Sequence, residues 1–161
     1  MVEFTGERVI PGQVDPDLWN EHYARYLFAG RLARHRRVLD VGCGSGYGSE
    51  LLAHTARAVI GVDVAPEAVE MSRERTASLA NVEIRQGSAT ELPVEAGSVD
   101  LVVAFEVIEH LENQAALIAE ARRVLAPGGQ FIVSTPNADY YAAQRGASGP
   151  NPFHSHEFTF D

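Results

Sequence analysis

The strongest constraint on the fold is an alternation of short apolar runs with longer segments of helical periodicity. The apolar runs predict β-strands at 38–41, 58–63, 82–85, 99–105 and 131–133. The periodic segments predict helices at 16–34, 46–54, 66–79 and 111–125. In the last helix the predicted buried stripe consists of Leu111, Ala115, Ile118, Ala121 and Leu125, and Pro127-Gly128-Gly129 is expected to stop it.

Strands that alternate with helices form a mostly parallel sheet with helices on both faces, a Rossmann-like α/β fold. A chain of 161 residues suits one domain. We expect an N-terminal loop and helix over 1–36, a ligand-binding core over 37–137 and a loop-rich tail over 138–161. Ligands bind such sheets beyond the carboxyl ends of the strands, so the residues that follow each strand are the candidate site residues.

A glycine-rich loop over residues 42–46 follows the first strand. Glycines allow a tight turn and let a ligand approach the backbone, and the helix after the loop begins with free N–H groups. The dinucleotide pattern G-x-G-x-x-G does not fit, because Tyr47 or Ser49 stands where its third glycine would be. The loop therefore predicts a ligand site and argues against a nicotinamide or flavin dinucleotide.

An acidic residue, Asp63, ends the second strand. Its carboxylate could accept hydrogen bonds from both hydroxyls of a ribose, or it could cap the helix that opens at Pro66. The presence of the glycine loop favours the ribose. After the third strand, Ser88 and Ala89 could meet the edge of an adenine ring or simply form a turn.

Two carboxylates and a histidine, Glu106, Glu109 and His110, follow the fourth strand. Such groups at the ligand edge of a sheet suggest chemistry. Histidine is the side chain that changes charge near neutral pH, so His110 could act as a base. The alternative is that Glu106 and His110 orient the backbone and cap the next helix.

Composition and charge argue against several classes of partner and cellular location. The formal net charge of -9 disfavours nucleic acid, and the basic residues within 31–37 fit the negative end of a helix dipole instead. No apolar run is long enough to span a membrane, and the first residues do not look like a secretion signal. Cys43 is the single cysteine, so an internal disulfide is excluded, and we expect a cytoplasmic protein.

Four segments carry a family resemblance: V-L-D-V-G-C-G-S-G-Y-G, I-G-V-D-V-A-P-E-A-V-E, V-D-L-V-V-A-F-E-V-I-E-H-L and V-L-A-P-G-G-Q-F-I-V-S-T-P-N. In this order, over roughly 37–137, they resemble class I S-adenosylmethionine-dependent methyltransferases, in particular the group with ubiquinone-biosynthesis and sugar methyltransferases. The resemblance implies S-adenosylmethionine as cofactor and a small-molecule oxygen or nitrogen nucleophile as methyl acceptor.

The resemblance also implies roles for single positions. The residues expected to contact or order the cofactor are Asp40, Gly42, Cys43, Gly44, Gly46, Asp63, Val64, Ser88, Ala89 and Phe105. Asp63 would hold the ribose, and His22 or Arg25 on the first helix could reach the cofactor carboxylate. His110 would be the catalytic residue, because it could deprotonate an oxygen nucleophile.

The tail lacks the helix and two strands that usually follow the fifth strand in this fold. We therefore expect the fifth strand to be an open edge that another segment covers or that pairs in a homo-oligomer. The tail and the residue before it supply the candidate acceptor contacts Asn137, Tyr140, Tyr141, His154 and His156. The two tail histidines with Glu157 would also suit a metal, but their loose spacing favours no metal.

Two other functions compete with methyl transfer. The chain could be a cofactor-binding module without activity, because the missing strands leave the acceptor site incomplete. It could also be a nucleotide-dependent oxidoreductase, which the broken glycine pattern disfavours.

Overall fold

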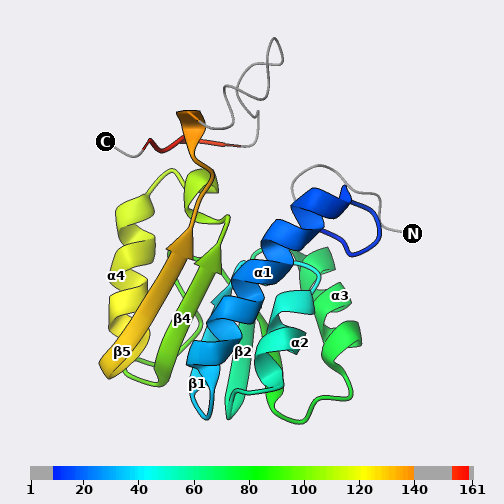
Figure 1. Ribbon diagram of the computed structural model, residues 1–161. Helices are drawn as coiled ribbons and strands as arrows, with labels where there is room; N and C mark the ends of the chain where they lie inside the picture. The colour runs from blue at the N-terminus through cyan, green and yellow to red at the C-terminus, as the bar shows by residue number, and fades with distance from the viewer. Residues whose placement is uncertain (1–8, 140–153, 160–161) are drawn as a thin grey trace.

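One parallel sheet organises the molecule. The computed structural model describes residues 9–139 and 154–159. Within these residues, five strands lie in the order β3-β2-β1-β4-β5, and each adjacent pair is parallel. The strands are β1 (Arg37–Val41), β2 (Ala58–Asp63), β3 (Val82–Gln86), β4 (Val99–Phe105) and β5 (Leu125–Ser134). This arrangement confirms the predicted Rossmann-like α/β fold (Figure 1).

Helices cover both faces of the sheet. They are α1 (Pro16–Ala33), α2 (Tyr47–Ala53), α3 (Pro66–Thr76) and α4 (Gln114–Val124), with a 3₁₀ turn, η1 (Ile108–His110), after β4. Val38 packs in one apolar cluster with residues of α1 and α2, whereas its neighbour Leu39 packs in another with residues of α4. Because successive strand residues point to opposite faces, α4 lies on the face opposite α1 and α2.

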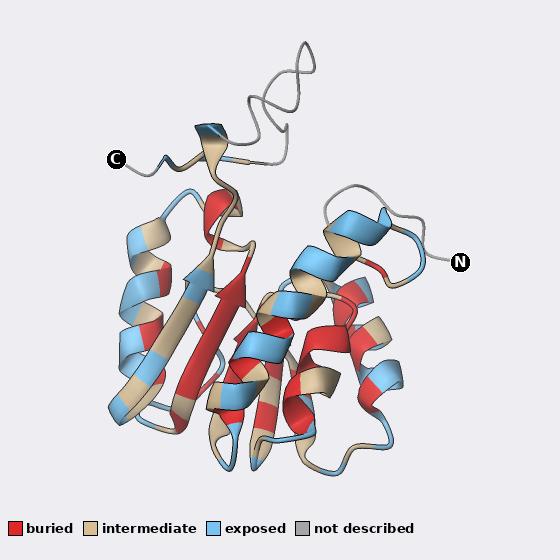
Figure 2. Cartoon of the chain, in the orientation of Figure 1, coloured by how far each residue is buried: buried red, intermediate tan, exposed pale blue. Residues whose placement is uncertain are grey.

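The core lies around the two central strands. Residues of β1 and β4 are mostly buried, whereas β5 carries intermediate and exposed residues (Figure 2). The chain runs from β1 through β2 to β3 in one direction and then returns to β4 on the other side of β1. The strand order therefore reverses between β1 and β4, where such sheets bind ligands at their carboxyl ends.

The first helix begins where the sequence predicts. The carboxylate of Asp15 accepts a hydrogen bond from the Asp17 N–H over 2.9 Å, and Pro16 takes the first helical position. Pro lacks an N–H, and the first turn of a helix needs none there. Tyr26, Ala29 and Ala33 are the buried residues of α1.

The last helix differs from the prediction. It begins after Asn113, whose side chain caps the helix by accepting from the Ala116 N–H over 3.2 Å. Of the predicted stripe, Ala121 is buried, whereas Ala115 is exposed and Ile118 is 53% exposed. The residues buried on this helix are Leu117, Ala121 and Val124, so the buried face is rotated from the predicted one.

The fifth strand is longer than predicted. Leu125 already has extended backbone angles, so the helix ends at Val124 and the strand begins before Pro127. The pairing of β4 with β5 shifts register between Val99 and Leu101, which accommodates the Pro-Gly-Gly segment in the strand.

An edge of the described sheet is formed by β5, and Val133 on it is 44% exposed. The segment 154–159 passes beside the end of this strand, where Phe158 pairs with Asn137 in a single parallel bridge. Among the described helices, none has both the length and the apolar character needed to cross a membrane.

Candidate active site

A cavity of about 540 Å³ opens at the carboxyl ends of the central strands. Its wall combines the loops after β1, β2, β3 and β4 with residues of α1 and with His154. The predicted site residues on this wall are Gly42, Cys43, Gly44, Asp63, Val64, Ser88, Ala89, Phe105, His110 and His154.

Other predicted site residues lie elsewhere. Asp40 lies beneath the glycine loop and Gly46 packs against Ser72, and neither lines the cavity. Asn137 also lies off the wall, and His156 is exposed. Tyr140 and Tyr141 lie outside the described residues.

The glycine loop is held against the end of β2. The N–H groups of Gly42 and Cys43 both donate to the carbonyl oxygen of Val62, over 2.8 and 3.1 Å. The next amide, that of Gly44, donates to the carboxylate of Asp63 over 2.9 Å. Gly42, Gly44 and Gly46 have φ values of 69°, 53° and 80°, which glycine adopts readily. The loop and the acid that the sequence singled out therefore form one unit.

Asp63 both orders the loop and closes a turn. One of its oxygens accepts from Gly44, and the other accepts from the Ala65 N–H over 3.0 Å. The two readings of Asp63, as a ligand contact and as a helix start, are thus compatible. Each carboxylate oxygen has a second lone pair for a ligand hydroxyl, and Val64 beside it is 67% exposed at the cavity.

A buried carboxylate supports the loop from below. Asp40 is fully buried and accepts hydrogen bonds from Tyr26 Oη over 3.0 Å and Ser49 Oγ over 2.7 Å. Burial raises the pKa of Asp40 to about 6, although these two hydrogen bonds oppose the shift. Asp40 of β1 therefore connects to α1 through Tyr26 and to α2 through Ser49. It does not line the cavity itself, whereas Tyr26 does.

The backbone after β4 is strained. Glu106 has a φ of 55°, a value unusual for a residue with a side chain. Its N–H donates to the Ser134 carbonyl over 3.0 Å, its carboxylate accepts from Ser134 Oγ over 2.8 Å, and Arg25 lies 3.6 Å away. These contacts hold Glu106 in place. Glu109 and His110 of η1, which follow it, line the cavity.

Sequence reasoning named Glu109 among the groups after β4 but did not select it as a site residue. Glu109 is 1% exposed and lines the cavity next to His110. Burial raises its pKa to about 7, and the nearby Glu106 carboxylate adds to this shift. The sequence offered one indication of its role: Glu109 stands three residues after Glu106 and directly before His110.

The first helix also contributes to the wall. His22 and Tyr47 line the cavity, and His22 Nδ1 lies 3.2 Å from Tyr47 Oη. Burial lowers the pKa of His22 to about 4, and the positive charge of Arg25 adds to this effect. A neutral His22 can thus offer a hydrogen-bonding group without adding charge to the cavity.

Comparison with known proteins identifies the family of this chain. Residues 39–133 match the family described as a methyltransferase domain. A probable S-adenosylmethionine-dependent methyltransferase of Mycolicibacterium smegmatis is 45% identical over 154 residues, which are 95% of this chain and 58% of that protein. A ubiquinone biosynthesis O-methyltransferase of Xanthomonas oryzae is 41% identical over 103 residues, which are 63% of this chain and 43% of that protein.

Solved structures agree as well. The YcgJ protein of Bacillus subtilis superposes with a TM-score of 0.74 at 25% identity, covering 86% of this chain and 64% of that one. The fold and site define a class I methyltransferase domain. The chain belongs to the methyltransferase domain family. It spans about 58% of the length of the mycobacterial relative.

Proposed function

We propose that this chain transfers a methyl group from S-adenosylmethionine to an oxygen or nitrogen atom of a small molecule. The observation that carries the proposal is a single cavity that joins the glycine loop and Asp63 to the imidazoles of His110 and His154. One end of the cavity suits the cofactor, and the other offers groups that can act on an acceptor.

The described residues fit the cofactor. A side chain built at Gly44 would meet no atom within 4 Å, so a ligand has room to approach this backbone. In our proposal the glycine loop holds the methionine part, Asp63 accepts from the ribose hydroxyls, and Val64 packs against the adenine. Ser88 and Ala89 border the adenine, and Phe105 lies near the reactive end.

The chemistry divides between cofactor and protein. The cofactor's sulfonium makes its methyl carbon electrophilic without help from the protein. The protein must hold a nucleophile in line with the breaking bond, about 3 Å from the methyl carbon. It can also take the proton from a hydroxyl acceptor, and we assign this role to His110 as the catalytic residue.

Several observations favour a small acceptor. A cavity of about 540 Å³ lies within the range of small-molecule sites, roughly 300–1,000 Å³. The ubiquinone-biosynthesis relative is named as an O-methyltransferase, which supports an oxygen acceptor here. We assign His154 to the acceptor side because it lines the cavity. Acceptor contacts by Asn137, Tyr140 and Tyr141 remain predictions, and the exposed His156 is not assigned to the site. A cytoplasmic location remains a prediction.

A methyl-transfer assay with a panel of small hydroxyl and amine acceptors tests the function. Acceptor-dependent formation of S-adenosylhomocysteine is expected. His110→Ala should lower turnover roughly 100-fold or more and leave S-adenosylhomocysteine binding intact. Cofactor binding without transfer to any acceptor would instead identify a binding module. Full turnover of His110→Ala would remove this residue from the mechanism.

A further inference from the structure

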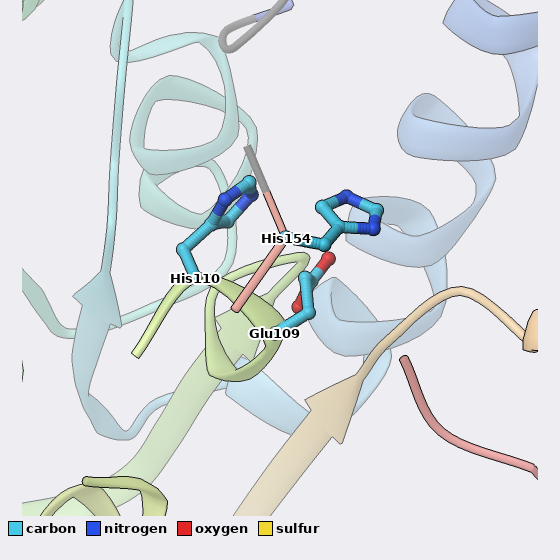
Figure 3. A group of neighbouring side chains, drawn as sticks. All are labelled: Glu109, His110 and His154. Carbon is cyan, nitrogen blue, oxygen red and sulfur yellow. The ribbon is translucent and has the colours of Figure 1, made fainter. Parts of the chain in front are cut away.

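Three metal-ligating groups meet beside the cavity. Glu109 and His110 come from η1, and His154 comes from the segment that follows the core. One ligand atom from each lies within 4.8 Å of the other two. Figure 3 shows the Glu109 carboxylate pointing toward the His154 ring, with His110 on the same turn. All three residues line the cavity that holds the proposed cofactor site.

Backbone hydrogen bonds build this cluster. The N–H groups of Ser155 and His156 donate to the carbonyl oxygen of Glu109 over 2.8 and 3.1 Å. Ser155 Oγ donates to the carbonyl oxygen of His110 over 3.2 Å. These contacts fix the backbone next to His154 relative to η1. The chain around His154 is therefore held close to Glu109 and His110 by hydrogen bonds of its own.

The charge of Glu109 needs a partner. Both of its carboxylate oxygens are buried without a hydrogen bond of ordinary geometry in the described part of the chain, and the nearby Thr135 hydroxyl only partly offsets the rise of the Glu109 pKa. A buried carboxylate without a partner is costly in its ionised form, and this cost is why its pKa is raised. A cation held between Glu109 and the two imidazoles would compensate that charge.

His154 is oriented as a metal ligand would be. Its side chain is 7% exposed, and its Nδ1 lies 3.6 Å from a carboxylate oxygen of Glu157. Histidines that bind a metal through one nitrogen usually direct the other toward a carboxylate or carbonyl. One nitrogen of the His154 ring lies within 4.8 Å of a ligand atom of Glu109 and of one of His110.

We propose that Glu109, His110 and His154 bind one divalent transition-metal ion, for which Zn²⁺ is the probe. Two imidazoles and one carboxylate form a ligand set found in catalytic zinc sites, which keep a further position open. Two atoms that each lie about 2.1 Å from one ion are at most about 4.2 Å apart. Small side-chain rotations would therefore close the cluster around the ion.

This inference rests on the proposed function and specifies how the acceptor is activated. A hydroxyl bound at the open position loses its proton to solvent more readily, because the ion stabilises the oxyanion. That oxygen forms the new bond to the methyl carbon while the carbon–sulfur bond breaks and the sulfur keeps its electron pair. The role of His110 is then that of a ligand, and the acceptor class narrows to hydroxyl compounds.

The sequence analysis favoured no metal, and the metal ligands that it considered were a different group of residues. It combined His154 and His156 with Glu157, all from the tail. In the structure His156 is exposed and is not part of the cluster. His156→Ala is therefore a matched control for His154→Ala, since the two residues share one segment.

The experiment is a calorimetric titration of zinc chloride into protein first freed of metal by a chelator. The proteins are the wild type, Glu109→Gln, His154→Ala and His156→Ala. We expect one zinc ion per wild-type chain, binding at least about tenfold weaker in Glu109→Gln and His154→Ala, and unchanged binding in His156→Ala. Binding of S-adenosylhomocysteine by each variant verifies that it is folded. His154→Ala keeps the test valid if Glu109→Gln does not fold.

Three results would overturn the proposal: no saturable zinc binding by the wild type, equal binding by wild type and His154→Ala, or equal losses in His154→Ala and His156→Ala. The readout is metal binding and not turnover. A failure here therefore leaves methyl transfer standing, and an inactive protein that binds zinc in this pattern would refute only the proposed function.

Discussion

The close packing of the glycine loop on α3 makes Gly46→Ala a quantitative test of how the site is built. At Gly46 the φ angle is +80°. A Cβ atom there would lie 2.8 Å from the Cα atom of Ser72 and 3.0 Å from its Cβ atom. The Cα atom belongs to the backbone of α3, so a change of rotamer at Ser72 cannot relieve the contact.

The expected destabilisation has two parts. An alanine in the left-handed region costs about 1–2 kcal/mol. Forcing a methyl group into a packed contact adds about 1–3 kcal/mol. The free energy of unfolding should therefore fall by about 2–5 kcal/mol, a large share of the roughly 5–15 kcal/mol that holds a domain folded.

Gly97→Ala separates the two parts. Gly97 has a φ of +64°, but a Cβ there would meet no atom within 4 Å. Only the backbone strain applies, so we expect a loss of about 1–2 kcal/mol. Urea unfolding followed by circular dichroism measures both variants. Equal losses in the two variants would show that the loop does not pack on α3 as described.

Three further predictions follow from the cavity, from the half-buried His22 and from the sheet edge. Gly44→Ala has open space around its Cβ, so it should unfold like Gly97→Ala but bind S-adenosylhomocysteine at least about tenfold more weakly in calorimetry; unchanged affinity would contradict the assigned place of the cofactor. The pKa of His22 is lowered from 6.5 to about 4, so the stability it contributes is present above pH 6.5 and is lost as the pH falls toward 4. Urea unfolding across this window should show a steeper loss in the wild type than in His22→Gln, by up to about 2 kcal/mol after solvent screening, and parallel pH profiles would refute the assignment. Finally, the exposed Val133 on β5 predicts a concentration-dependent increase in mass by light scattering that Val133→Lys reduces; a constant monomer mass in the wild type would count against it.

The sequence was sufficient for the features that depend on local patterns. The strands β1, β2 and β4 are buried on both faces, and such strands appear in the sequence as short apolar runs. The glycine loop and Asp63 could be placed together because parallel strands end at the same edge of the sheet. The start of α1 agrees with the predicted helix at 16–34, because Asp15 caps the helix and Pro16 suits its first position.

Features that depend on tertiary contacts were missed. The start of α4 was predicted too early, since Leu111 continues the apolar periodicity although Asn113 caps the helix. The start of β5 was placed too late, because Pro127 and its two glycines look like a break in the sequence while pairing with β4 overrides that preference.

The cluster at η1 could not be found from the sequence for a similar reason. Glu109 and His154 meet where the Ser155 and His156 N–H groups and the Ser155 hydroxyl bond to carbonyl oxygens of η1. Backbone hydrogen bonds of this kind leave no pattern of residue types. His154 lines the cavity, whereas His156, two residues later, is exposed. The local sequence does not distinguish these two histidines.

A crystal structure with bound S-adenosylhomocysteine tests the central claim most directly. The account predicts the ribose hydroxyls within hydrogen-bonding distance of the Asp63 carboxylate and the homocysteine part along residues 42–46. It also predicts the sulfur atom on the side of the cavity that faces His110. A ligand bound outside this cavity, or with its ribose away from Asp63, would contradict the account.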